Sequence, residues 1–173
     1  MARPKSLPDA EVLASVRRIL ADHGDRAVSF GSVSQATGLA GPTLVQRFGT
    51  REGMVRAALS AAWDALEALT ERAEADTPLS AKGAQAFLKL LGAESETSEI
   101  SLLAADFRDP ALRERAAAWR ARVEAALALR LGGGGKAREA AAILFTAWQG
   151  QLLWQQAGGK AFRLKDALKR ISG

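Results

Sequence analysis

Three side chains between positions 43 and 47 have the chemistry needed to bond the edges of nucleic-acid bases. Arg47 carries a planar guanidinium that can donate two hydrogen bonds to guanine O6 and N7, and Gln46 can pair with adenine. Thr43 can contact a thymine methyl group or a phosphate. On an α-helix these positions share one side, whereas Leu44 and Phe48 fall on the other. The spacing therefore predicts a short helix whose outer side suits the major groove.

The rest of the chain offers little chemistry for catalysis or metal binding. With no Cys and one His, it has no thiol nucleophile, thiolate site or His-rich metal site. Gly132–Lys136 fails as a phosphate loop, because Arg130 stands at its first glycine position and Ala137 follows the lysine. The carboxylates of Glu94 and Glu96 lie in a polar stretch and are expected in solvent. We therefore predict no enzyme activity, no cofactor and no metal.

Composition and charge agree with a globular protein that has a polyanionic partner. Of the 173 residues, 48% are hydrophobic and 25% charged, and the net charge is +5. Residues 1–56 hold eight Lys or Arg against five Asp or Glu, so this segment alone carries +3. The stretch after the basic N-terminus is interrupted by charges and is not a signal peptide. The expected location is the cytoplasm.

The elements that position these side chains are predicted to be helices throughout. Ala, Leu, Arg and Glu are abundant and apolar residues recur every three or four positions. We expect an all-α protein with helices at about 8–22, 30–37, 41–48, 51–75, 80–91, 98–107, 110–131, 137–156 and 160–171. The predicted domains are a three-helix unit over 1–50, which contains a helix-turn-helix, and a helical bundle over 51–173.

Local signals mark several helix ends. Ser6 with Asp9 is a plausible capping pair for the first helix, and Ser29 and Thr50 can cap later ones. Pro42 suits the first turn of the third helix. The four glycines 132–135 predict a flexible break.

Residues 9–59 resemble the DNA-binding domain of the TetR family of transcriptional regulators. The matching segments are Asp22-His23-Gly24, Gly38-Leu39-Ala40, Thr43-Leu44-Val45-Gln46-Arg47-Phe48 and Thr50-Arg51-Glu52. Three positions depart from the family pattern: Val45 replaces a Tyr whose hydroxyl reaches a phosphate, Ala40 a capping Ser, and Pro42 a frequent Gly. The resemblance implies the fold, whereas these departures put the usual DNA contacts in question.

The resemblance and the residue chemistry together give a set of DNA-binding candidates. Arg51 matches the family's phosphate-contacting Lys, Ser29 and Ser32 lie at a helix N-terminus, and Arg3 and Lys5 form either an arm along the DNA or an inert end. The full set is Thr43, Gln46, Arg47, Arg51, Ser29, Ser32, Val45, Lys5 and Arg3. For Arg47, a solvated surface charge is the alternative.

The resemblance also implies that the larger bundle dimerises and binds a small effector. The predicted dimer interface, on the helices at 137–156 and 160–171, consists of Leu144, Ala147, Gln151, Leu164, Leu168 and Ile171. The residues expected to line an apolar effector pocket are Phe87, Leu91, Leu103, Phe107, Trp119 and Trp148. Both sets have an alternative interpretation as ordinary core within one subunit.

These inferences lead to one main function and one rival. The main one is a homodimeric TetR-like regulator, most simply a repressor, that binds a palindromic DNA operator and is released by a small, largely apolar effector. The rival is a ligand- or protein-binding helical module with a degenerate DNA-binding domain. Val45 and Ala40 motivate the rival.

Overall fold

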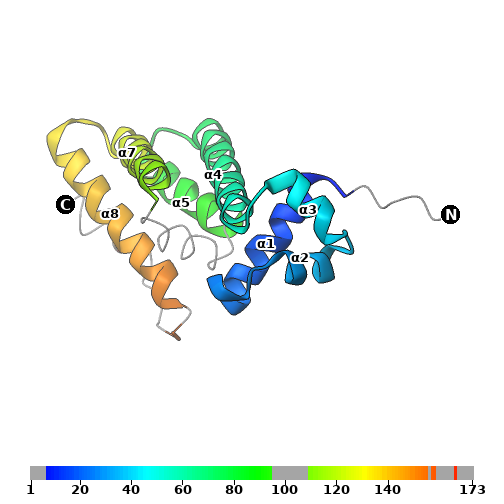
Figure 1. Cartoon of the computed structure of the whole chain (residues 1–173). Helices are drawn as coiled ribbons and strands as arrows, with labels where there is room; N and C mark the ends of the chain where they lie inside the picture. The colour runs from blue at the N-terminus through cyan, green and yellow to red at the C-terminus, as the bar shows by residue number, and fades with distance from the viewer. Residues whose placement is uncertain (1–6, 95–108, 156, 159–165, 167–173) are drawn as a thin grey trace. The chain divides into compact units, whose positions relative to one another are not determined.

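The computed structural model describes residues 7–94, 109–155, 157–158 and 166, and the elements in these ranges are all helical (Figure 1). They are α1 (Asp9–His23), the 3₁₀ turn η1 (Asp25–Ala27), α2 (Phe30–Thr37), α3 (Gly41–Phe48), α4 (Arg51–Asp76), α5 (Ala81–Glu94), α7 (Pro110–Arg130) and α8 (Gly134–Gln155). The predicted all-α fold is confirmed. The helices expected at 98–107 and 160–171 lie outside the described residues.

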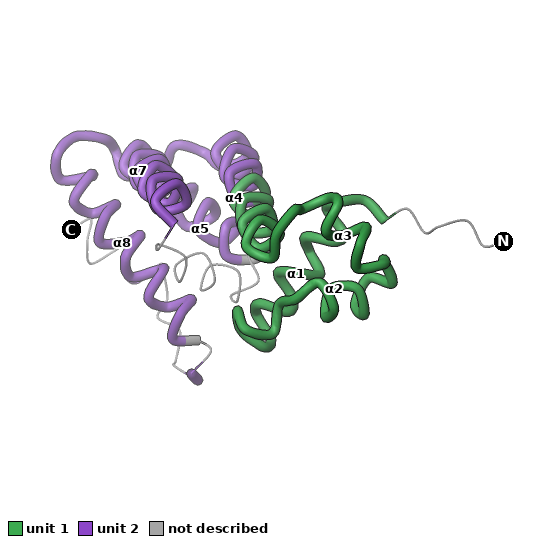
Figure 2. The backbone as a smooth tube through the Cα atoms, viewed as in Figure 1, with its two compact units in different colours: residues 1–65 green, residues 66–173 purple. Residues whose placement is uncertain are grey.

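The chain divides into two compact units, Met1–Ala65 and Leu66–Gly173 (Figure 2). The division falls inside α4, whereas the sequence analysis placed it between residues 50 and 51. The first turns of α4 belong to unit 1 because Met54, Ala58 and Leu59 are buried there. Buried apolar side chains of this kind supply the largest favourable term in folding.

Unit 1 is built on helices α1, α2 and α3. Val12, Val16 and Leu20 form the buried stripe of α1, while the neighbouring Leu13 is half-buried. Helix α1 contacts α2, and α2 contacts α3, whose Leu44 is fully buried.

Helix ends in unit 1 follow local chemistry. Ser29 and Ser32 form a reciprocal capping box at the start of α2, with hydrogen bonds of 3.0 and 2.9 Å. Thr50 Oγ1 accepts a 2.9 Å hydrogen bond from the Gly53 amide and so caps α4, as expected. The N-cap of α1 is Pro8, without a side-chain bond, and the predicted capping residue Ser6 lies outside the described residues.

The turn between α2 and α3 depends on Gly38. Its backbone is left-handed (φ 74°, ψ 8°), and its amide donates a 2.8 Å hydrogen bond to the Ser34 carbonyl. A side chain makes this conformation costly, whereas glycine adopts it readily. Only three residues therefore separate the two helices of the helix-turn-helix.

Unit 2 contains α5, α7, α8 and the C-terminal part of α4. Helix α7 contacts both α5 and α8, and the core includes Phe87, Leu127 and Leu144. The glycine break after α7 is shorter than predicted, because α8 already begins at Gly134. Gly132 and Gly133 have φ values of 99° and 73°, which lets the chain reverse in a tight turn.

Polar side chains join α4 to α7 within unit 2. Arg115 donates to both carboxylate oxygens of Glu67 at 2.6 and 2.8 Å, and Arg122 does the same to Glu74 at 3.0 and 2.7 Å. Each pair spans 48 residues, so the two helices run side by side in the same direction. Among the described residues, no helix is long and apolar enough to cross a membrane.

Candidate nucleic-acid interface

Helix α3 presents polar side chains and one large apolar side chain to the exterior of unit 1. Gln46 and Arg47 are exposed, Thr43 is half-buried, and Val45 retains 45% of its surface. Leu44 is fully buried on the opposite side. The predicted amphipathic division of this helix is therefore present in the structure.

Arg47 does not extend freely from the helix. Its Nη1 donates hydrogen bonds to the Leu7 carbonyl at 2.7 Å and to Asp9 Oδ1 at 3.1 Å. The Asp9 carboxylate is 64% exposed, and ion pairs in such surroundings contribute only about 0–1 kcal/mol. The Arg47 side chain itself is 26% exposed and also bonds the Leu7 carbonyl, so the guanidinium must exchange both acceptors to reach a base. The sequence held no signal for this contact, which joins residues 38 positions apart.

Arg51 is held more firmly than Arg47. Its Nε donates to the Val28 carbonyl at 2.9 Å, and its Nη2 donates to the backbone oxygen of Asp25 and forms a 2.8 Å ion pair with the carboxylate of Asp25. These bonds tie the loop before α2 to the first turn of α4. Arg51 thus has a positioning role that the sequence analysis did not anticipate, and its predicted phosphate contact stays a prediction.

The hydroxyls of Ser29 and Ser32 are also engaged within unit 1. Beyond the capping box, Ser32 Oγ donates a 2.8 Å hydrogen bond to the Ala27 carbonyl. Their contact with phosphate stays a prediction, as does that of Arg3 and Lys5, which lie outside the described residues.

Four of the predicted effector-pocket residues lie in the interior of unit 2. Phe87 and Leu91 are fully buried, and Trp119 and Trp148 are nearly so. Leu103 and Phe107 lie outside the described residues. The structure therefore brings the four into one core, and their contact with a ligand stays a prediction.

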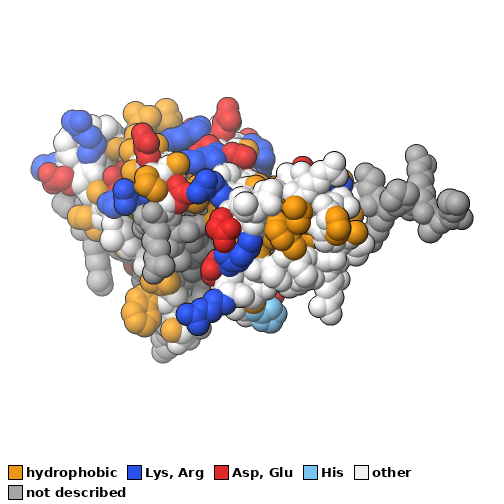
Figure 3. All heavy atoms as spheres, viewed as in Figure 1, with side chains coloured by type: hydrophobic (Ala, Val, Ile, Leu, Met, Phe, Trp, Pro, Cys, Tyr) orange, Lys and Arg blue, Asp and Glu red, His pale blue; other side chains and the backbone are white. Residues whose placement is uncertain are grey.

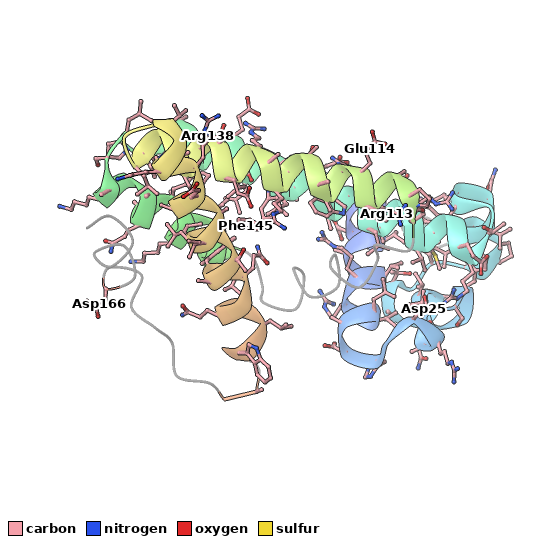
Figure 4. All side chains as sticks on the ribbon, turned by 90° about the vertical axis from the view of Figure 1, so that its left-hand side faces the viewer. Asp25, Arg113, Glu114, Arg138, Phe145 and Asp166 are labelled. Atoms are coloured by element: carbon pink, nitrogen blue, oxygen red, sulfur yellow. The ribbon has the colours of Figure 1, made fainter. Side chains whose placement is uncertain are left out.

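Aromatic packing links part of this core. Trp119 Nε1 donates a 2.8 Å hydrogen bond to Thr70 Oγ1, which satisfies the indole inside the protein. The ring of Phe145 lies 5.8 Å from that of Trp119 and 6.0 Å from that of Trp148, on the side of α8 that faces α7 (Figure 4). Phe145 was not among the residues predicted to line the pocket, although it lies three residues before Trp148.

Arg130 is the one charged side chain that is buried among the described residues. Its guanidinium lies 4.8 Å from the centre of the Phe87 ring and donates to the carbonyls of Glu74, Thr77 and Ala126 at 2.9, 3.1 and 2.9 Å. Burial lowers the pKa of the Arg130 guanidinium below its usual value, and the charge of Glu74 opposes this shift. We call this group the Arg130 clamp, because it holds the carbonyl end of α4 against α7.

The predicted dimer residues divide between the interior and the surface. Leu144 is fully buried within unit 2, which favours the alternative interpretation of this residue as core of one subunit over its predicted place in the dimer interface. Ala147 and Gln151 are half-buried, and Leu164, Leu168 and Ile171 lie outside the described residues. The exposed apolar side chains of α8 are instead Ile143, Leu153 and Trp154. Their spacing relative to Ala147 and Gly150 was a readable signal that the sequence analysis overlooked.

Comparison with solved structures finds several proteins that share this fold. The chain is 22% identical to a transcriptional regulator from Rhodococcus sp. Rha1 with a TM-score of 0.74, covering 96% of this chain and 95% of the other. A TetR transcriptional regulator from Legionella pneumophila is 19% identical with a TM-score of 0.73, covering 98% and 97%. A putative transcriptional regulator from Saccharomonospora viridis, in complex with choline, is 15% identical with a TM-score of 0.71, covering 94% and 92%.

No protein-family model matches the sequence, and no curated protein matches it. Over nearly the whole chain, the fold of helix-turn-helix and helical bundle is nevertheless shared with solved TetR-type transcriptional regulators. The resemblance found in the sequence is confirmed in the fold. None of the three proteins compared is described as an enzyme.

Proposed function

We propose that this protein is a TetR-like transcriptional regulator, not an enzyme, which binds a palindromic operator as a homodimer. The observation that carries the proposal is the outer side of α3, where Gln46 and Arg47 are exposed on the second helix of a helix-turn-helix. Each subunit places α3 in the major groove of one half-site, and the half-sites lie about 34 Å or a multiple of that apart.

Dimerisation is supported by an exposed apolar surface on α8. Ile143 is 56% exposed and Trp154 is 67% exposed, and with Ala147 and Gly150 they follow a spacing of four, three and four residues along one side of the helix. We call these four residues the α8 face. Small residues at its centre permit the close approach of a second helix, and large exposed apolar side chains mark interaction sites.

Repression with release by a small, largely apolar effector completes the proposal. The aromatic core around Trp119 and Trp148 supports an apolar ligand, and the choline complex of one structural neighbour supports small-molecule binding in this fold. An effector acts by binding more tightly to a conformation whose α3 helices do not fit the operator.

The proposal is tested by selecting binding sites for the full chain from a library of random DNA duplexes. We expect an enriched palindrome whose affinity falls steeply with salt, as phosphate contacts require. The Arg47→Ala variant is expected to bind that palindrome about tenfold more weakly and to discriminate less at one base pair per half-site, as loss of a base contact costs about 1–3 kcal/mol.

The matched control is Arg138→Ala, which removes an exposed arginine near the start of α8 (Figure 4). It is expected to leave both affinity and base preference unchanged. If no sequence is enriched and no salt-sensitive binding is found, the rival function of a binding module without operator recognition is favoured.

A further inference from the structure

Val45 has an unusual position among the apolar side chains of unit 1. It is the only large hydrophobic residue described as exposed in this unit, since the others lie in unit 2. Its neighbours on the same side of α3 are Pro42, which is exposed, and Gln46. Hydrophobic side chains reach the surface over α3 in Figure 3.

Core packing does not explain Val45, because Leu44 already supplies the fully buried contact of α3. A phosphate contact does not explain it either, since an isopropyl group neither donates nor accepts hydrogen bonds. Residues 42–46 include no charged side chain, and the guanidinium of Arg47 donates to Leu7 and Asp9.

The major groove offers one apolar group to such a surface, the C5 methyl of thymine. We propose that Val45 reads thymine methyl groups, so that α3 selects half-sites with an A·T pair at the position Val45 contacts. Gln46 complements this choice, because its amide can bond N6 and N7 of adenine in a neighbouring pair. The proposal rests on the proposed function and names the base chemistry recognised there.

The proposal is tested with the palindrome enriched for the full chain. Each thymine of a half-site is replaced in turn by deoxyuridine, which keeps the hydrogen-bonding edge but lacks the methyl group. At one position per half-site we expect an affinity loss of roughly fourfold, the effect of exposing one buried methyl group.

The Val45→Ala variant, combined with the deoxyuridine replacement, completes a double-mutant cycle across the proposed contact. It is expected to bind the thymine and deoxyuridine duplexes equally at that position, which assigns the methyl sensitivity to the contact with Val45 rather than to altered DNA. The control Leu79→Ala, which truncates a 72% exposed leucine of unit 2, is expected to keep the full thymine preference.

Three outcomes of these experiments would contradict either the role of Val45 or the proposed function. If the wild-type chain binds every deoxyuridine duplex as tightly as the thymine duplex, Val45 does not read methyl groups, although operator binding stands. Methyl sensitivity that persists in Val45→Ala also overturns the proposal. If the library yields no enriched sequence, the proposed function fails, and this inference with it.

Discussion

Arg47 and Arg51 stand four residues apart with the same charge, yet their surroundings give them different freedom. Arg47 shares an exposed ion pair with Asp9, whereas Arg51 is bonded to the backbone of Val28 and to both the backbone and the carboxylate of Asp25. Arg47 can exchange its partners more readily than Arg51, so it is the better candidate for a contact with a base. Arg51 has more partners, so it is the better candidate for a positioning residue. Neither difference was readable from the sequence, since the partners are distant along the chain.

The Arg130 clamp gives a prediction about stability at the residue scale. Arg130→Met keeps much of the buried volume but removes every donor to the carbonyls of Glu74 and Thr77. Buried carbonyls without a partner are costly, so we expect the free energy of unfolding to fall by about 2–4 kcal/mol. Urea unfolding followed by circular dichroism measures the change.

The control for the clamp is Arg138→Met, which alters an exposed arginine on α8. It is expected to change the free energy of unfolding by less than about 0.5 kcal/mol. Equal stability of the two variants would show that the clamp contributes nothing beyond the packing of its methylene groups.

At the scale of elements, the bounds of a helix could be predicted from the sequence where the residues that set them lie close to the helix ends. Helices α2 and α3 were placed correctly from sequence because Ser29, Gly38 and Gly49 lie beside the ends that they set. For α8 the periodicity was visible in the sequence, but the choice between core and dimer interface depends on packing against α7. Leu144 illustrates this, because it is fully buried in unit 2, as the alternative interpretation has it.

Helix α3 lacks one stabilising feature that can be added. Its N-cap residue, Ala40, has extended backbone geometry (φ −66°, ψ 139°) and makes no side-chain bond. In Ala40→Ser the hydroxyl can accept from the Thr43 amide, which now donates only to the Ala40 carbonyl at 3.0 Å, and we expect a gain of about 0.5–1 kcal/mol in the free energy of unfolding of unit 1. Thermal unfolding detects the gain as a higher midpoint.

The matched control is Ala36→Ser, an equally exposed alanine inside α2. There the hydroxyl meets no free amide and serine is a weaker helix former, so a loss of about 0.5 kcal/mol is expected. A gain at both positions would mean that the effect comes from added polarity rather than from capping.

For the molecule as a whole, the α8 face predicts the oligomeric state. The wild-type chain is expected to sediment as a dimer at micromolar concentration. Trp154→Glu places a charge among the apolar contacts and should shift the protein to a monomer of 18.3 kDa. Sedimentation velocity distinguishes the two species.

Leu79→Glu is the matched control, since Leu79 is 72% exposed and lies outside α8. It is expected to leave the dimer intact. A wild-type monomer, or a Trp154→Glu dimer of unchanged stability, would contradict the assignment of the α8 face to the interface.

Helix α4 runs unbroken for 26 residues across the boundary between the two units. At 1.5 Å per residue it is about 39 Å long. A fragment that ends at residue 50 loses Met54 and Leu59, which are buried side chains of unit 1. Exchange of DNA-binding units between such proteins, in evolution or in the laboratory, must therefore carry the first turns of α4 along with α1, α2 and α3, because a junction at residue 50 removes part of the core of unit 1.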